Sequence, residues 1–245
     1  MCIRDSLADM EGVPPVETTG QVRWYKRPTP GMTYLVSLDP SMGTGGDFAA
    51  IQVFELPTFE QVGEWQHNMT PMNKQVQILQ GINKHIHDSI LERDASASPQ
   101  IFYSMENNTI GEAALMRVMD IGEENIMGMF LSEPIRKGHR RKFRRGFNTT
   151  AKHKIDACTK FKELVEGGKM KINSQLLISE LKDFVATGMS YKAKPGQHDD
   201  LVSSCLLMTR MMKVLADFDP KIFEKWTNRT SELTTPMPIF GNFYG

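Results

Sequence analysis

The chain has 245 residues, of which 40% are hydrophobic and 24% charged, and its 29 basic residues balance its 29 acidic ones. This composition is typical of a globular protein and excludes a collagenous, wholly disordered or uniformly cationic chain. It contains no apolar run of about 18 residues, so we expect no membrane partner, and its three scattered cysteines indicate neither a disulfide framework nor a zinc site.

The first half of the chain predicts a hairpin meander followed by a helix. Residues 1–30 contain four prolines and few apolar residues, which indicates a linker or N-terminal extension. Residues 34–39, 49–55 and 60–68 are short β-favouring runs separated by a glycine-rich turn and a proline, so we expect three antiparallel strands. Apolar residues three and four apart over 73–92 predict a long helix.

The second half predicts alternating strands and helices. We expect strands over 100–105 and 126–131, with a helix between them that Thr109 caps. Further helices are predicted after Thr149 and Thr150 up to Gly167, over 176–185, and from Asp199 onward, with a polar segment over 190–197. This order predicts an α/β fold with a mixed sheet and flanking helices, a domain over 31–216 and a C-terminal tail over 217–245.

Acidic residues stand where these elements end or begin. Asp39 ends the first strand, Glu106 ends the fourth, and Asp199 and Asp200 open the last helix. If the first and fourth strands are neighbours, their carboxylates emerge at one edge of the sheet. Converging carboxylates repel and need a cation, and oxygen ligands select Mg²⁺ or Mn²⁺. Two such ions, roughly 3.5–4 Å apart, can activate a water and stabilise the leaving oxygen of a phosphodiester.

Each acid also has a structural interpretation. Asp39 and Glu106 are both followed by turn-forming residues, and Asp199 and Asp200 suit the N-terminus of any helix. His198 is either a surface residue or a donor behind the acids.

Four stretches of the chain are characteristic together: residues 35–47, 106–111, 146–154 and 196–202. The last, Gly-Gln-His-Asp-Asp-Leu-Val, is the most specific, because it follows a glycine-containing loop and opens an apolar helix. Together they resemble the nuclease domain of the large terminase subunit of tailed bacteriophages. The resemblance covers roughly residues 30–216.

The resemblance implies an RNase H-like fold of the RuvC/RNase H superfamily and a two-metal endonuclease, using Mg²⁺ or Mn²⁺, that cuts concatemeric double-stranded viral DNA. Asp39 and Glu106 match the first two metal-binding acids. The third falls on the aspartate pair, where we favour Asp200 as the principal ligand and Asp199 as an auxiliary one.

Further residues match the same pattern outside these acids. Asp47 matches a recurrent acid in the hairpin, with its role open, and Asn108 and Gly111 match a turn that shapes the site behind Glu106. By the same resemblance the partners are the ATPase part of the terminase, the portal protein and the small terminase subunit, in the host cytoplasm during virion assembly. The sequence has no Gly-x-x-x-x-Gly-Lys-Ser/Thr phosphate loop, so we expect the C-terminal half of a longer protein or a fragment.

A basic segment precedes the helix that Thr149 and Thr150 open. It is either a solvated loop or a DNA-binding loop that neutralises phosphates without reading bases; Lys152 and Lys154 extend the patch onto the next helix. Its charged residues are Arg136, Lys137, Arg140, Arg141, Lys142, Arg144 and Arg145.

Two other functions share these features. Another nuclease of the RNase H superfamily, such as a Holliday-junction resolvase or a transposase, would use the same acids on a different substrate. A non-catalytic module for DNA docking or motor assembly would carry the acids as structural residues.

Overall fold

The computed structural model describes residues 7, 10–134, 145–188 and 190–218, and a mixed seven-stranded sheet lies at its centre. Neighbouring strands are antiparallel from the β1 edge to β3, whereas β3, β6 and β7 are parallel. In spatial order the strands are β1 (Glu17–Thr19), β2 (Val22–Trp24), β5 (Glu60–His67), β4 (Ala49–Leu56), β3 (Thr33–Asp39), β6 (Gln100–Met105) and β7 (Met129–Phe130).

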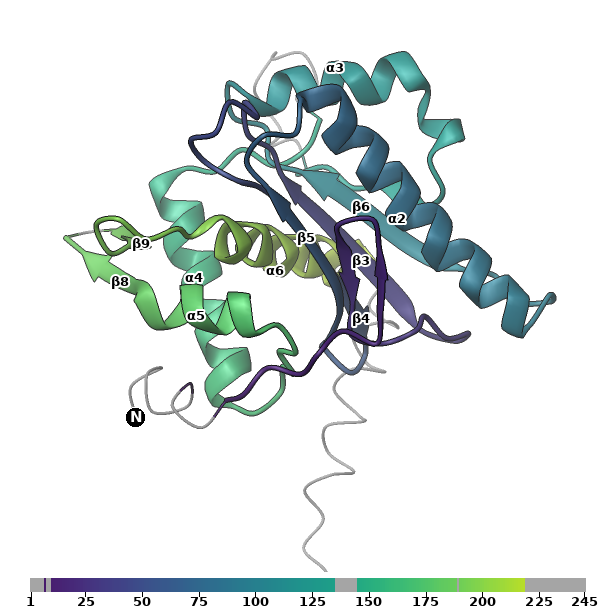
Figure 1. Cartoon of the computed structure of the whole chain (residues 1–245), viewed down its shortest axis with the longest axis horizontal. Helices are drawn as coiled ribbons and strands as arrows, with labels where there is room; N and C mark the ends of the chain where they lie inside the picture. Colours follow the sequence, from purple (N-terminus) through teal and green to yellow (C-terminus); the bar gives the residue numbers. More distant parts are fainter. Residues whose placement is uncertain (1–6, 8–9, 135–144, 189, 219–245) are drawn as a thin grey trace, which may run out of the picture.

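Helices cover both faces of this sheet (Figure 1). On one face lie α2 (Met72–Arg93) and α3 (Gly111–Ile121), followed by the short 3-10 helix η1 (Glu123–Asn125). On the other lie α4 (Ala151–Glu166), α5 (Gln175–Asp183) and α6 (Asp200–Phe218). A separate hairpin of β8 (Phe184–Thr187) and β9 (Ser190–Ala193) connects α5 to α6. The mixed sheet with flanking helices confirms the predicted fold class.

The alternation of side chains along β3 divides the core into two parts. Tyr34, Val36 and Leu38 belong to the cluster under α2 and α3, whereas Leu35 belongs to the cluster under α4, α5 and α6. Because successive residues of a strand point to opposite faces, Ser37 and Asp39 lie on the same side as Leu35. The side chain of Asp39 is therefore directed to the α6 face.

A pair of reciprocal hydrogen bonds holds α6 against β3. The Ser37 hydroxyl donates to the Ser204 carbonyl oxygen at 2.8 Å, and the Ser204 hydroxyl donates to the Ser37 carbonyl oxygen at 2.9 Å. Both residues are fully buried. These bonds fix the position of the helix along the strand, and therefore the position of its first turn.

The N-terminal segment differs from the expected linker. Within residues 1–30, β2 pairs with β5, through Arg23 opposite Glu64 and Trp24 opposite Gly63, so this part of the segment extends the sheet. Trp24 is 1% exposed and stacks on His85 with ring centroids 4.4 Å apart. Strands of three residues flanked by prolines carry too little periodic signal to be recognised in the sequence.

Several element boundaries also differ from the predicted ones. The strand expected over 126–131 is paired only at Met129–Phe130, and the end of the helix expected over 176–185 belongs to β8. The polar segment 190–197 contains β9, and α6 begins at Asp200 rather than Asp199. The first two residues of the predicted tail, 217 and 218, belong to α6. Its remaining residues, 219–245, lie outside the described part of the chain.

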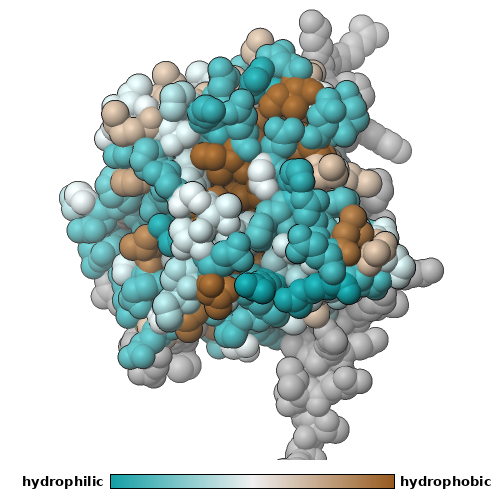
Figure 2. Space-filling model, turned by 45° about the vertical axis from the view of Figure 1, so that its right-hand side comes forward, coloured by the Kyte–Doolittle hydropathy of each residue, from teal (hydrophilic) through white to brown (hydrophobic). Residues whose placement is uncertain are grey.

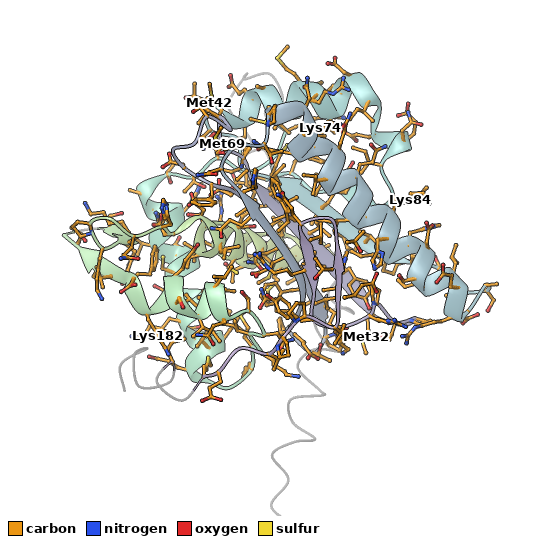
Figure 3. All side chains as sticks on the ribbon, in the orientation of Figure 1. Met32, Met42, Met69, Lys74, Lys84 and Lys182 are labelled. Atoms are coloured by element: carbon orange, nitrogen blue, oxygen red, sulfur yellow. The ribbon has the colours of Figure 1, made fainter. Side chains whose placement is uncertain are left out.

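The surface is mostly hydrophilic on the face shown in Figure 2, with separate hydrophobic patches. Met42 and Met69, 63% and 59% exposed, lie at one end of the molecule in Figure 3, on loops that Gly45 and Asn68 join through backbone hydrogen bonding. The first of these loops directly follows Asp39. In the described part of the chain, no helix combines the length and apolarity needed to cross a membrane.

We predict that Trp24→Ala destabilises the domain by about 3–5 kcal/mol, because it removes a fully buried aromatic ring. Equilibrium urea denaturation measures the change. Val16→Ala, at a residue that is 62% exposed in the same segment, is the matched control and should change stability by no more than about 0.5 kcal/mol. Equal effects of the two substitutions would contradict the inclusion of β2 in the fold.

Candidate active site

The parallel pairing of β3 with β6 brings Asp39 and Glu106 together. Leu38 is opposite Met105 in this pair, and the backbone N–H of Glu106 donates to the Leu38 carbonyl oxygen at 3.1 Å. Asp39, the last residue of β3, and Glu106, the residue after β6, therefore lie at the same ends of two neighbouring strands. Phe102 precedes Glu106 by four residues, so the two side chains point to the same face of the sheet. Phe102 packs on the α6 face, which is also the face to which Asp39 points.

The first turn of α6 adds the aspartate pair. Asp200 precedes Ser204 by one helical turn, roughly 6 Å along the axis, and Asp39 follows Ser37 by two residues, roughly 6.6 Å along the strand. The serine hydrogen bonds fix these two spacings, and the two acids lie at the same end of the strand–helix pair. The electrostatics agree, because both Asp200 and Asp199 act on the Asp39 carboxyl group.

Asp39 is the most strongly perturbed of these acids. Its pKa lies well above its usual value because the carboxyl group is buried, and because the charge of Glu106 and a direct side-chain hydrogen bond with Glu106 both favour the protonated form. Asp200 and Asp199 raise the pKa further. The Asp39 and Glu106 side chains therefore interact directly, and a bound cation would relieve the repulsion between them.

Asp200 is held between the helix and the β3–β4 hairpin. Burial raises its pKa to about 6, and the charges of Asp199 and Asp47 act in the same direction. The Phe48 backbone N–H donates to the carboxylate, which opposes this shift, as does the nearby His198. The Nδ1 atom of the half-exposed His198 ring lies 3.6 Å from Asp200 Oδ2. Asp47 and His198 are therefore neighbours of Asp200.

Asp199 has a different environment from Asp200. Its Oδ2 atom accepts a hydrogen bond from the Ala193 backbone N–H at 3.2 Å and lies 3.8 Å from Lys154 Nζ. Its carboxylate therefore also ties the β8–β9 hairpin and α4 to the start of α6.

Glu180 of α5 fixes the first turn of α6 and was not recognised in the sequence. Its Oε2 atom accepts hydrogen bonds from the backbone N–H groups of Leu201 at 2.9 Å and Val202 at 3.2 Å. Its Oε1 atom accepts one from Gln66 Nε2 at 2.8 Å. Burial raises the Glu180 pKa to about 7. A carboxylate in the middle of a helix gives no sequence signal for capping another helix.

A tight turn shapes the site behind Glu106. The Asn108 side chain donates to Glu106 Oε2 at 3.1 Å and accepts from the backbone N–H groups of Ile110 and Gly111 at 3.1 and 2.8 Å. A Cβ atom on Gly111 would lie 1.8 Å from the Glu106 carbonyl oxygen, so only glycine fits there. Asn108, and not the expected Thr109, therefore provides the side-chain hydrogen bonds at the start of α3.

Of the predicted DNA-binding residues, Arg145 and Lys152 lie in the described part of the chain. Arg145 forms an ion pair with Glu123, and its carbonyl oxygen accepts a hydrogen bond from Asn107. Lys152 is exposed on the first turn of α4. The other predicted residues, Arg136, Lys137, Arg140, Arg141, Lys142 and Arg144, lie outside the described residues.

Comparison with known families decides the identity of this arrangement. A family described as "Terminase RNaseH-like domain" matches residues 36–211, which include all four acids of the cluster. The chain belongs to the terminase RNase H-like domain family. The resemblance of the sequence to a terminase nuclease domain is thereby confirmed.

Solved structures with the same fold agree with this assignment. The terminase domain is similar to the large terminase nuclease of the thermophilic phage G20c, described with bound magnesium, at 18% identity and a TM-score of 0.60, covering 85% of this chain and 96% of that one. The chain is also similar to the large terminase nuclease domain of Thermus phage P74-26, at 18% identity and a TM-score of 0.59, covering 85% of this chain and 94% of that one. A third similar structure is the human cytomegalovirus terminase nuclease domain, manganese-soaked and inhibitor-bound, at 14% identity and a TM-score of 0.52, covering 84% of this chain and 92% of that one.

The acids of the terminase domain suit a hard divalent cation. Asp39, Glu106 and Asp200 offer only oxygen ligands, the donor type that Mg²⁺ and Mn²⁺ prefer. Among the residues that the structure describes, no three ligand side chains already surround a single point. The direct contact of Asp39 with Glu106 and their mutual repulsion nevertheless identify the place where a cation would be stabilised.

We predict that Asp39→Asn raises the melting temperature of the metal-free terminase domain at pH 7.5. The folded-state pKa of Asp39 is above its unfolded value, so its charge opposes folding above the folded pKa, and the penalty fades as the pH falls toward the ordinary value near 3.8. The gain, roughly 2–4 °C per kcal/mol, should disappear at that pH. Differential scanning calorimetry in EDTA measures it.

Asp88→Asn is the control of opposite sign, because Lys84 and His87 lower the pKa of Asp88. It should leave stability unchanged or slightly reduced at pH 7.5. A lower melting temperature for Asp39→Asn than for the unaltered chain would refute the electrostatic account.

We also predict that Glu180→Ala destabilises the domain by about 1–3 kcal/mol, because it leaves the N–H groups of Leu201 and Val202 without their acceptor. Amide hydrogen exchange should accelerate at these two residues. Glu163→Ala is the control, since Glu163 is exposed and pairs with Lys160 on the surface of α4. Unchanged protection of the first turn of α6 would mean that Glu180 does not position it.

Proposed function

We propose that this terminase domain is a Mg²⁺- or Mn²⁺-dependent endonuclease that hydrolyses phosphodiester bonds of double-stranded DNA during viral genome packaging. The observation that carries the proposal is the convergence of Asp39, Glu106 and Asp200 at one sheet edge, where each neighbour adds to the repulsion on Asp39. Such a concentration of partly buried acidic groups is unfavourable for folding and has a purpose when cations are bound there.

Each residue has a definite part in this proposal. Asp39, Glu106 and Asp200 would hold the ions, with Asp199 as an auxiliary ligand. Two bound ions would activate the attacking water and stabilise the leaving oxygen. Asn108 orients Glu106 through its hydrogen bond to Oε2, and the Phe48 N–H and Glu180 orient Asp200 and the turn that carries it.

The metals seen with related proteins support this choice. Structures of the G20c nuclease are described with bound magnesium, cobalt and zinc, and the cytomegalovirus domain as manganese-soaked. The oxygen-only ligands of the present site favour magnesium or manganese over zinc, which binds well to imidazole and thiolate.

The proposed substrate is concatemeric DNA, contacted through its phosphates. Arg145, Lys152 and the basic residues of segment 136–144 would supply salt-dependent binding without base specificity. By family membership, the proposed partners are the ATPase part of the terminase, the portal protein and the small terminase subunit, and the proposed place of action is the host cytoplasm during virion assembly.

The decisive experiment is cleavage of supercoiled and linear plasmid DNA by the purified chain in Mg²⁺ or Mn²⁺. We expect Asp39→Asn, Glu106→Gln and Asp200→Asn each to reduce the rate by more than about 100-fold, the upper end for residues that only support a ligand. Asp156→Asn, at an exposed acid on α4, should cleave at the rate of the unaltered chain.

The outcomes separate this function from its alternatives. Full cleavage by Asp39→Asn would exclude the proposed mechanism. DNA binding without cleavage by the unaltered chain would favour a module that only docks DNA. Cleavage restricted to four-way junctions would instead indicate a resolvase.

A further inference from the structure

A cavity opens beside Glu106, on the side of the acids that faces α4. Its volume is about 130 Å³. Its walls carry two cationic side chains, Lys154 and Arg210, and the hydroxyl groups of Thr149 and Ser203. Ala157, Leu206 and Leu207 form an apolar part of the lining. Glu106 therefore belongs both to the cluster of acids and to the lining of a cavity that carries two cations.

We infer that this cavity binds a phosphodiester group of the DNA strand, and that Lys154 is the residue that positions it. The inference rests on the proposed nuclease function. An oxyanion of the strand would contact the cations and hydroxyl groups, while the carbon atoms of the adjoining deoxyribose would lie against the apolar lining. This chemistry does not depend on base sequence.

The two cations of the cavity differ in how far their donors are already used. The Arg210 guanidinium forms an ion pair with Glu133 and donates to Thr149 Oγ1 at 2.9 Å and to the Asn148 carbonyl oxygen at 3.0 Å. It also lies over the Phe147 ring, 5.1 Å from the centroid. Its side chain is only 11% exposed. Arg210 therefore anchors the segment that precedes α4 and contributes charge to the cavity.

Lys154, in contrast, has donors available. Its nearest acidic partner is Asp199 Oδ2 at 3.8 Å, which is beyond hydrogen-bond distance, and its Nζ lies 5.6 Å from the centroid of the Phe184 ring. Its side chain is 24% exposed. The ammonium group thus lies beside Asp199 in the wall of the cavity, and no described residue accepts a hydrogen bond from it. A phosphate oxygen in the cavity would give it a stronger, hydrogen-bonded partner.

The Thr149 hydroxyl adds a second donor. Because its oxygen accepts the hydrogen bond from Arg210, its own proton is free to be donated to an anion. Thr149 lies two residues before α4 and Lys154 lies in its first turn, so one short segment presents both donors. Lys152 lies two residues away on α4, about 200° around the helix from Lys154, and faces solvent.

The test measures the affinity of the full chain for a short DNA duplex by fluorescence anisotropy in EDTA, over a range of salt concentrations. Lys154→Met keeps the packing against Phe184 and removes the charge; we expect about tenfold weaker binding and a salt slope reduced by about one. Lys154→Arg should restore most of the affinity. Lys160→Met, on the exposed face of the same helix, should bind like the unaltered chain.

A second measurement identifies the contacted group. Each duplex carries one neutral methylphosphonate linkage, at a different position. At one position the neutral linkage should weaken binding of the unaltered chain, whereas it should not weaken binding of Lys154→Met any further. Equal affinities of Lys154→Met and Lys160→Met, or full additivity at every linkage, would overturn the inference. If either of these overturning results occurs while the unaltered chain still cleaves DNA and Asp39→Asn does not, the cavity assignment fails and the proposed function stands. If the unaltered chain neither binds nor cleaves DNA, both proposals fail.

Discussion

Repulsion among carboxyl groups at one end of the sheet is the constraint around which this domain is organised. Asp39 and Glu106 contact each other, and the aspartate pair at the start of α6 adds further negative charge. An arrangement of this kind opposes folding and persists only when the surrounding structure holds each group in place. The supporting contacts of Asn108, Phe48, Glu180 and the Ser37–Ser204 pair all hold these groups in place.

Each acid is held from a different direction. Backbone pairing of β3 with β6 determines the separation of Asp39 from Glu106, and the Asn108 turn orients the Glu106 carboxylate. Asp200 depends on longer-range contacts, because its turn is capped by Glu180 and its carboxylate is bonded to Phe48. The site therefore combines four segments that are distant in the sequence: the end of β3, the turn after β6, α5 and the start of α6. None of them alone would form a site.

The sequence predicted the elements whose patterns are long and regular. The buried strands and the amphipathic α2 helix follow from periodicity, and Asp39 and Glu106 were recognised because they stand where strands end. The three-residue strands β1 and β2 could not be recognised, because their stability comes from packing of Trp24 and from pairing with β5. Short, proline-flanked runs give no reliable periodic signal.

The parts of the site that escaped prediction depend on packing between helices. Glu180 has the local sequence of an ordinary helix residue, and its role follows only from the approach of α5 to the start of α6. The sequence predicted both Lys152 and Lys154 as part of the basic patch, but only the docking of α4 distinguishes them, by directing Lys154 toward the cavity beside Glu106.

The two serines between β3 and α6 have a consequence for the uniqueness of the folded state. Apolar side chains at Ser37 and Ser204 could pack in several alignments, whereas two directional bonds permit one. A slip of α6 by one turn would displace its aspartates by about 5.4 Å, more than the roughly 4 Å that separates paired ions in two-metal enzymes. A pair of hydroxyl groups thus selects the helix alignment that keeps Asp199 and Asp200 beside Asp39.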